Sequence, residues 1–216
     1  MSLLAQDPPS KHIHPVPVVG AKAPTHPNLK LPSDKPTIIV FLRHCGCPFA
    51  EKTFRELTKL STYHKDVHFV AVSHCSPEIT ERWVVSVGGN WDVEVLIDEQ
   101  RDLYALFGLG TSTTWHVYSP AALYSALQLG KRENIWNRPA AENGGSRWQM
   151  GGAFAISGGR DSSDGGDGNG NADGVVRWAF VPPRSDILPD WDAAVQSVGV
   201  TPRPKPPPPV RTDGFL

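Results

Sequence analysis

The sequence predicts an α/β fold in which a central mixed sheet is flanked by helices. Through the first two thirds of the chain, short apolar runs typical of buried strands alternate with amphipathic segments of helical length, a pattern that favours parallel strand pairing. Two further strand-like runs then flank a glycine-rich stretch, as in an antiparallel hairpin. A last amphipathic segment predicts a closing helix.

The first strand and the first helix carry the clearest patterns. Residues 38–42 form a continuous apolar run, which is typical of a strand buried on both faces. Residues 48–60 predict an amphipathic helix whose charged residues lie mostly off the apolar face, with Glu51 four residues before Arg55, the spacing of a helical ion pair. The expected buried face consists of Ala50, Phe54, Leu57 and Ser61.

The alternation continues beyond this helix. Residues 67–72 predict a second strand. Ser76 and Pro77 suit the N-cap and first position of a helix that runs to Gly88. The remaining elements expected before the hairpin are a strand at residues 93–97 and helices at residues 99–107 and 119–129.

The hairpin and the closing helix complete the predicted layout. Residues 152–156 and 175–180 predict its two strands, and residues 157–174, rich in Gly, Asp, Asn and Ser, predict an enlarged loop between them. Residues 188–198 predict the last helix. Parallel strand–helix units followed by a hairpin and a helix are the layout of the thioredoxin fold, so we expect a thioredoxin-like fold with a Gly-rich hairpin insertion.

We expect one domain, residues 37–199, between two irregular ends. Residues 1–36 are rich in Pro and His without a periodic apolar pattern, which predicts an arm over the surface. Residues 200–216 predict a disordered Pro-rich tail. Its segment 203–211 contains P-x-x-P with basic flanks, so an SH3-type partner is an alternative to simple disorder.

The charge balance and hydropathy argue against nucleic acid and membranes as partners. A net charge of −1 gives no basic field for phosphate groups. No apolar stretch approaches the roughly 20 residues that cross a bilayer, and the N-terminal residues lack the apolar region of a secretory signal. We therefore expect a cytoplasmic protein.

The cysteines are the candidate reactive groups. The chain has three, an odd number that suits thiol chemistry better than a framework of structural disulfides. Pro48 suits the first helical position, which places Cys47 at the N-cap, where the helix dipole and free N–H groups favour thiolate. Cys47 is therefore the predicted nucleophile.

Cys45 and Cys75 compete as the thiol that resolves oxidised Cys47. Cys75 follows the second strand as Cys47 follows the first, and equivalent loops after parallel strands emerge at one edge of the sheet. A bond between Cys45 and Cys47 would close a small, strained ring. We favour Cys75, and both alternatives stay open.

A metal centre is an alternative interpretation of these residues. Candidate soft ligands come from the pairs His44–Cys45 and His74–Cys75, together with Cys47. Their spacing matches no standard zinc finger or ribbon. We therefore expect no metal and no bound cofactor.

The segment Phe41–Glu51 (FLRHCGCPFAE) resembles the F-x-R-H-x-x-C-x-x-C-x-E stretch of AhpC/TSA antioxidant-enzyme-domain proteins, specifically their peroxiredoxin-like 2 branch. The similarity extends over about residues 18–199. It implies a thioredoxin-like fold and thiol-based antioxidant or reductase activity on peroxides or disulfides, with Cys47 as the first active-site cysteine and thioredoxin or glutathione as external reductant. Ala50 replaces the second cysteine of the motif, and His44 stands where typical peroxiredoxins carry Thr or Ser.

Three further residues are candidate site residues. His44 is expected to hydrogen-bond the thiolate or to act as general acid toward the leaving hydroxide. Arg43 is expected to stabilise the thiolate electrostatically, and Arg147 supplies a second cation just before the hairpin. The leading hypothesis is a thiol oxidoreductase. The alternatives are a non-catalytic thioredoxin-fold binding scaffold and an accessory redox enzyme that acts on a specialised small metabolite.

Overall fold

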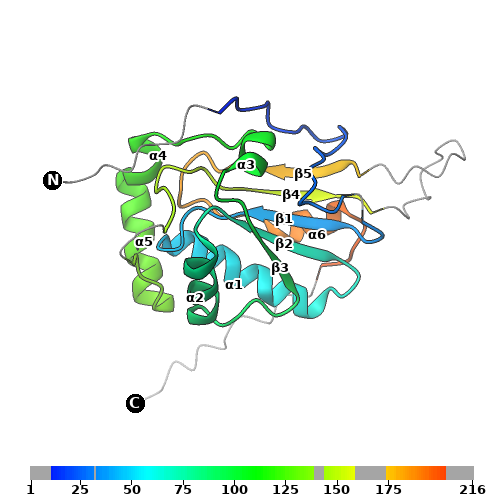
Figure 1. The fold of residues 1–216 in the computed structure, drawn as a ribbon. Coiled ribbons are helices and arrows are strands. Elements are labelled where there is room, and N and C mark those ends of the chain that lie inside the picture. The colour runs from blue at the N-terminus through cyan, green and yellow to red at the C-terminus, as the bar shows by residue number, and fades with distance from the viewer. Residues whose placement is uncertain (1–10, 32, 139–143, 159–173, 203–216) are drawn as a thin grey trace, which may run out of the picture.

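A computed structural model of the chain describes residues 11–31, 33–138, 144–158 and 174–202. At its centre lies a five-stranded sheet with strand order β3-β2-β1-β4-β5 (Figure 1). The pairs β1–β2 and β2–β3 are parallel, whereas β1–β4 and β4–β5 are antiparallel. The strands are β1 (Thr37–Phe41), β2 (His68–Ser73), β3 (Val93–Ile97), β4 (Gly152–Ile156) and β5 (Val176–Phe180).

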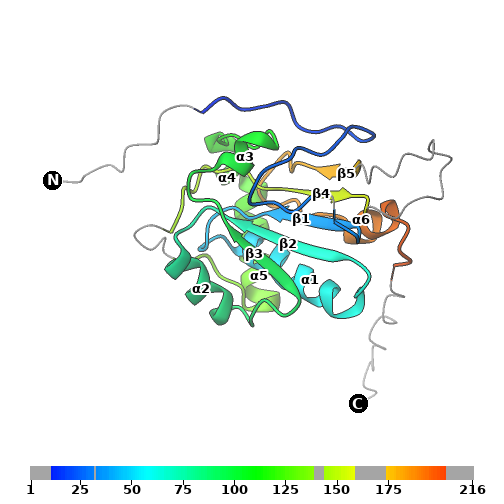
Figure 2. The ribbon, with the colours of Figure 1, turned by 45° about the vertical axis from the view of Figure 1, so that its right-hand side comes forward.

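The helices occupy both faces of the sheet, as Figure 2 shows. The predicted α/β fold with a mixed sheet is thus confirmed. The helices are α1 (Pro48–Tyr63), α2 (Pro77–Ser86), α3 (Asp102–Leu106), α4 (Thr114–Tyr118), α5 (Pro120–Glu133) and α6 (Trp191–Ser197).

The differences from the predicted helices have local causes. Helix α3 begins later than expected because the Asp98 carboxylate accepts the backbone N–H groups of Asp102 and Leu103 at 2.9 and 2.8 Å, which caps the helix there. The Asp190 side chain likewise accepts the N–H of Ala193 and sets the start of α6. Helix α4 was not predicted; Thr113 caps it by accepting the N–H of a residue in its first turn.

Alternation along the central strands divides the core into two layers. Ile38 and Val40 of β1 face the layer that contains α1, α2 and α6, whereas Ile39 and Phe41 face the layer that contains α3. Phe54 of α1 is fully buried in the first layer. Every strand residue of β1 is buried, as expected for a strand covered on both faces.

The predicted apolar face of α1 is buried as expected, but Glu51 departs from the prediction. Its side chain is 2% exposed even though it lies off the apolar face. The expected pair with Arg55 forms at 2.6 Å, and Arg138 approaches the other carboxylate oxygen at 3.1 Å. Two guanidinium groups therefore compensate the burial of this carboxylate.

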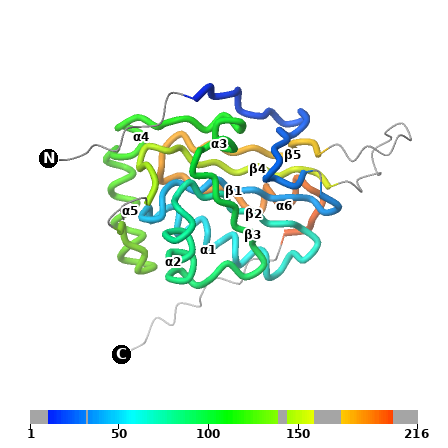
Figure 3. Tube along the Cα trace, in the orientation of Figure 1, coloured from blue at the N-terminus to red at the C-terminus, as the bar shows by residue number. Residues whose placement is uncertain are grey.

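The N-terminal arm runs along the α3 side of the sheet (Figure 3). Residues 11–31 contain neither a helix nor a strand, yet Ala23 and Leu29 are buried in the second core layer. Hydrogen bonds tie the arm to the domain, including that from His14 N to Ala105 O at 3.0 Å. Most of the predicted hairpin loop (159–173) and of the Pro-rich tail (203–216) lies outside the described residues, as does the candidate SH3-binding segment.

The carboxyl ends of β1 and β2 place the cysteine-bearing loops side by side. The buried Tyr104 hydroxyl contacts the carbonyl oxygens of Leu42 and Val72, at 2.6 and 2.8 Å, where the two strands end. Cys45 and Cys47 follow the first strand, and Cys75 follows the second.

Within the described residues, no helix is long and apolar enough to span a membrane.

Candidate active site

Cys47 lies at the N-cap of α1, as the position of Pro48 predicts. A tight turn delivers it there, because its N–H donates to His44 O at 3.0 Å. The residue is 3% exposed, and its side chain makes no capping bond to the helix. The sulfur therefore lies at the positive end of a 16-residue helix, where negative charge is stabilised.

Arg43 contacts this sulfur from the end of β1. Its Nη1 lies 3.5 Å from Cys47 Sγ, and its Nη2 donates to Arg147 O at 2.7 Å. The side chain is buried, so water screens its charge only weakly. Gly151 makes room for it, since a Cβ there would lie 3.3 Å from Arg43 Cγ. The expected cation beside the nucleophile is therefore Arg43.

His44 is a neutral residue near Cys47 in the same turn. Burial, then the charges of Arg43 and Arg147, lower the pKa of its imidazole to about 3. Nδ1 accepts the N–H of Gly46 at 3.1 Å, which leaves the ring proton on Nε2. His44 can therefore offer a neutral N–H donor at physiological pH, and it carries no positive charge there.

A cavity of about 120 Å³ opens beside Cys47. Arg43, His44 and Arg147 line it together with the cysteine, so polar groups gather at its reactive end. Helices α4 and α5 contribute apolar side chains to the lining of the same cavity, namely Val117, Tyr118, Ala122, Leu123 and Ala126.

Cys45 and Cys75 form a separate thiol pair. The N–H of Cys45 donates to Cys75 Sγ at 3.4 Å, and Ser73 Oγ contacts both residues, at 3.9 Å from Cys45 Sγ and 3.2 Å from Cys75 N. A hydrogen bond between the thiols raises the pKa of Cys45 and lowers that of Cys75. Cys75 is fully buried and Cys45 is half-buried.

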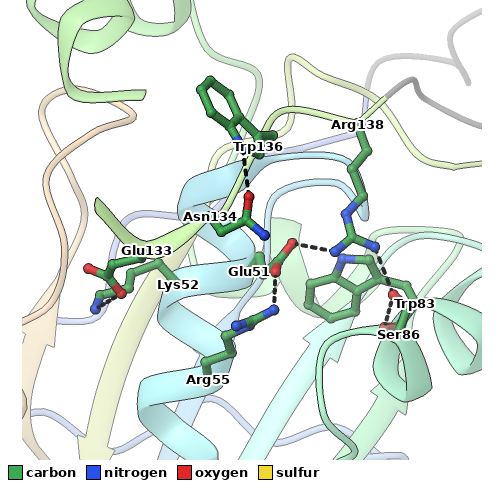
Figure 4. Close-up of polar contacts among 9 residues, drawn as sticks. All are labelled: Glu51, Lys52, Arg55, Trp83, Ser86, Glu133, Asn134, Trp136 and Arg138. Carbon is green, nitrogen blue, oxygen red and sulfur yellow. Dashed lines mark hydrogen bonds and ion pairs between the residues drawn. The ribbon is translucent and has the colours of Figure 1, made fainter. Parts of the chain in front are cut away.

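Cys45 faces a second cavity, of about 240 Å³, that does not include Cys47. Arg82, Trp83 and Arg138 line this cavity beside the thiol. Figure 4 shows Arg138 between Glu51 of α1 and Ser86 of α2, with hydrogen-bonding distances of 3.1 and 2.9 Å. Its backbone N–H also donates to Gly46 O at 3.0 Å, so this arginine fixes the turn between the two cysteines.

The structure thus brings all six predicted site residues to one edge of the sheet, in two groups. Cys47, Arg43, His44 and Arg147 share the first cavity, whereas Cys45 and Cys75 contact each other on the other side of the turn. His74 packs against Tyr104 with ring centroids 5.4 Å apart. Among the described residues, no group of three or more His, Cys, Asp and Glu side chains is arranged to hold a metal ion.

Sequence reasoning missed several residues of the site. Arg138 and Ser73 were not singled out, because their contacts join segments far apart in the sequence. Tyr118 and its apolar neighbours belong to the unpredicted α4 and the start of α5. The available signal was Thr113, a capping residue just before a short apolar stretch.

The fold and the Cys47 site define a thioredoxin-like thiol protein. The model of the AhpC/TSA antioxidant enzyme family matches residues 52–162, just over half of the chain. The chain belongs to the AhpC/TSA antioxidant enzyme family, and the predicted resemblance is confirmed. The matched segment begins after Cys47, so the cysteine motif itself lies outside it.

Solved structures share the fold. A peroxiredoxin-like protein from Aquifex aeolicus superposes with a TM-score of 0.54 at 15% identity, covering 87% of this chain and 89% of that one. A thiol peroxidase from Chromobacterium violaceum gives a TM-score of 0.53 at 14% identity, covering 85% and 87%. These likenesses confirm the thioredoxin-like fold.

A curated relative matches part of the chain. The prostamide/prostaglandin F synthase of Salmo salar is 33% identical over 90 residues, which cover 42% of this chain and 44% of the salmon protein. The chain therefore matches less than half of that relative's length.

Proposed function

We propose that the protein is a thiol peroxidase whose nucleophile is Cys47. The observation that carries this proposal is the buried guanidinium of Arg43 at 3.5 Å from Cys47 Sγ, at the N-terminus of α1 and beside a cavity. A thiolate is the reactive form of cysteine, and both the cation and the helix terminus favour it. Membership of the AhpC/TSA family supports the same chemistry.

The chemical step follows from this arrangement. The thiolate sulfur attacks one peroxide oxygen, an S–O bond forms, and the O–O bond breaks to give a sulfenic acid and an alkoxide or hydroxide. In this proposal the Nε2–H of His44, which lines the same cavity, hydrogen-bonds the leaving oxygen, and that oxygen takes its proton from water. Arg43 and Arg147 stabilise the negative charge as it moves from sulfur to oxygen.

The cavity favours an organic hydroperoxide over hydrogen peroxide. Its lining includes the apolar side chains of Val117, Tyr118 and Leu123, and such side chains would bury an alkyl chain. The name of the salmon relative points in the same direction, because prostaglandins are lipids. The oxidised protein is then returned to its reduced state by an external thiol of the thioredoxin or glutathione type.

The decisive test is to trap the Cys47 sulfenic acid. The Cys45→Ala/Cys75→Ala double variant leaves Cys47 as its sole thiol. We expect cumene hydroperoxide to give a dimedone adduct on this residue, located by tandem mass spectrometry, and to react faster than hydrogen peroxide. The matched control adds Cys47→Ser and should give no adduct.

A second assay measures turnover by NADPH consumption, coupled through thioredoxin or glutathione. We expect wild-type protein to consume peroxide catalytically and Cys47→Ser to lose this activity. Absence of any adduct on Cys47 in the double variant would refute the proposed function. Adduct formation without turnover by either reductant would instead favour a binding scaffold.

A further inference from the structure

Cys45 and Cys75 lie close enough together to be candidates for a disulfide. Cys75 Sγ lies 3.4 Å from Cys45 N, which places it within about 5 Å of Cys45 Cα. The contact therefore brings Cys75 Sγ next to the residue whose sulfur it would bond in a disulfide. Ser73 Oγ contacts both residues, through Cys45 Sγ and Cys75 N.

Cys45 is also the thiol nearest to Cys47 in the chain. The two residues are the second and fourth positions of the turn closed by the bond from Cys47 N to His44 O at 3.0 Å. Cys75, by contrast, is fully buried, and its sulfur is occupied by Cys45 N and by Gly144 O at 2.9 Å. A direct attack of Cys75 on Cys47 would have to break these contacts, whereas Cys45 is only two residues from Cys47 in the chain. The strain of the small Cys45–Cys47 ring makes that disulfide a short-lived intermediate that exchanges readily.

We propose that Cys45 and Cys75 form a dithiol relay. Cys45 first forms a disulfide with oxidised Cys47, and thiol–disulfide exchange then leaves a Cys45–Cys75 disulfide. This inference rests on the proposed function. It assigns Cys45 a role in both disulfides of the cycle. It also places the attack of the external reductant at Cys45, the half-exposed member of the pair, in the cavity lined by Arg82, Trp83 and Arg138.

The steps balance as follows. The Cys45 thiol attacks the sulfenic sulfur of Cys47, forming an S–S bond and releasing water. The Cys75 thiolate then attacks Cys45 Sγ, so that a Cys45–Cys75 bond forms and the Cys47 thiolate leaves. Cys75 Sγ, which lies 3.4 Å from Cys45 N, is the sulfur already held next to Cys45 for this second attack. Two external thiols finally reduce the disulfide and become one disulfide themselves.

The test maps disulfides in the full-length protein after one equivalent of cumene hydroperoxide. Free thiols are blocked with N-ethylmaleimide before proteolysis, and tandem mass spectrometry locates the label and the crosslink. In the wild type we expect the Cys45–Cys75 bond, with the label on Cys47. Cys75→Ser and the apolar Cys75→Ala should both accumulate a Cys45–Cys47 bond, and Cys45→Ser should retain Cys47 as sulfenic acid. Thermal unfolding of each reduced variant verifies that it folds.

Two results would overturn the relay. One is a Cys47–Cys75 bond in the wild type, with the label on Cys45. The other is formation of the Cys45–Cys75 bond at an unchanged rate in Cys47→Ser, where we expect it to slow at least tenfold. The Cys45→Ala/Cys75→Ala variant distinguishes failure of the relay from failure of the proposed function. If only the relay is wrong, Cys47 of this variant should still form the dimedone adduct. If the proposed function is wrong, it should form none.

Discussion

The contact between Arg43 and Cys47 makes a quantitative prediction about the reactivity of the sulfur. Both side chains are buried, at 6% and 3% exposure, so the guanidinium acts on sulfur with little screening by water. Hydrogen bonds to charged groups contribute about 1.5 to 3 kcal/mol, and about 1.4 kcal/mol corresponds to a factor of ten. Arg43→Gln, which removes the charge but keeps a donor, should therefore slow alkylation of Cys47 about tenfold to a hundredfold.

The assay is the second-order rate constant with iodoacetamide at pH 7, in the Cys45→Ala/Cys75→Ala background. Iodoacetamide is uncharged, so its rate reports the state of the sulfur and not electrostatic attraction of the reagent. Arg43→Lys keeps a positive charge and should stay within a few-fold of the parent. An Arg43→Gln protein that reacts at the parental rate, with unchanged unfolding, would refute the role given to the guanidinium.

Three further predictions concern the structure around the site. Glu51→Gln should lower the free energy of unfolding, measured in urea, by about 1 to 3 kcal/mol, because it weakens two guanidinium contacts of a buried carboxylate. The control Glu133→Gln, on the surface, should change this free energy by under about 1 kcal/mol. Burial lowers the pKa of His44 to about 3 and that of His74 to about 4. As pH falls below 6.5, the unfolded state therefore binds protons that the folded state does not. Each histidine should lower the free energy of unfolding by about 1.4 kcal/mol per pH unit, down to the pKa of that histidine in the folded protein. Urea titrations at pH 7 and 5 measure this slope, which His44→Asn should reduce and which would be absent if the imidazoles were already charged in the fold. Gly46→Ala should destabilise the turn, since its Cβ would lie 2.6 Å from a carbonyl oxygen of the loop after α5, and an unchanged melting temperature would contradict that contact.

Local patterns were sufficient to predict the strands, most of the helices and the position of Cys47. The apolar run before Arg43 has one reasonable interpretation as a buried strand, and Pro48 fixes the start of α1 by its own backbone chemistry. The five-residue α4 carries too short an apolar pattern to be recognised.

Contacts between distant segments were beyond the sequence. Glu51 was expected off the apolar face because it is charged, and its compensating partner Arg138, in a loop far along the chain, could not be foreseen. The pairing of Cys45 with Cys75 depends on the direction of the turn that Arg138 holds, and spacing alone does not give that direction. Reasoning from neighbouring strand ends did place the three cysteines at one edge, but not in their two groups.

The Tyr104 hydroxyl, set between the carbonyl oxygens of Leu42 and Val72, occupies the point where β1 and β2 part. The hydroxyl thereby holds the two strand ends, from which the cysteine loops begin, at a fixed separation. The spacing of the strand ends that precede Cys45 and Cys75 is thereby set in the core, while Arg138 holds the turn that follows. Sequence changes in the cavity linings can therefore alter what the cavities admit while the two strand ends keep their spacing.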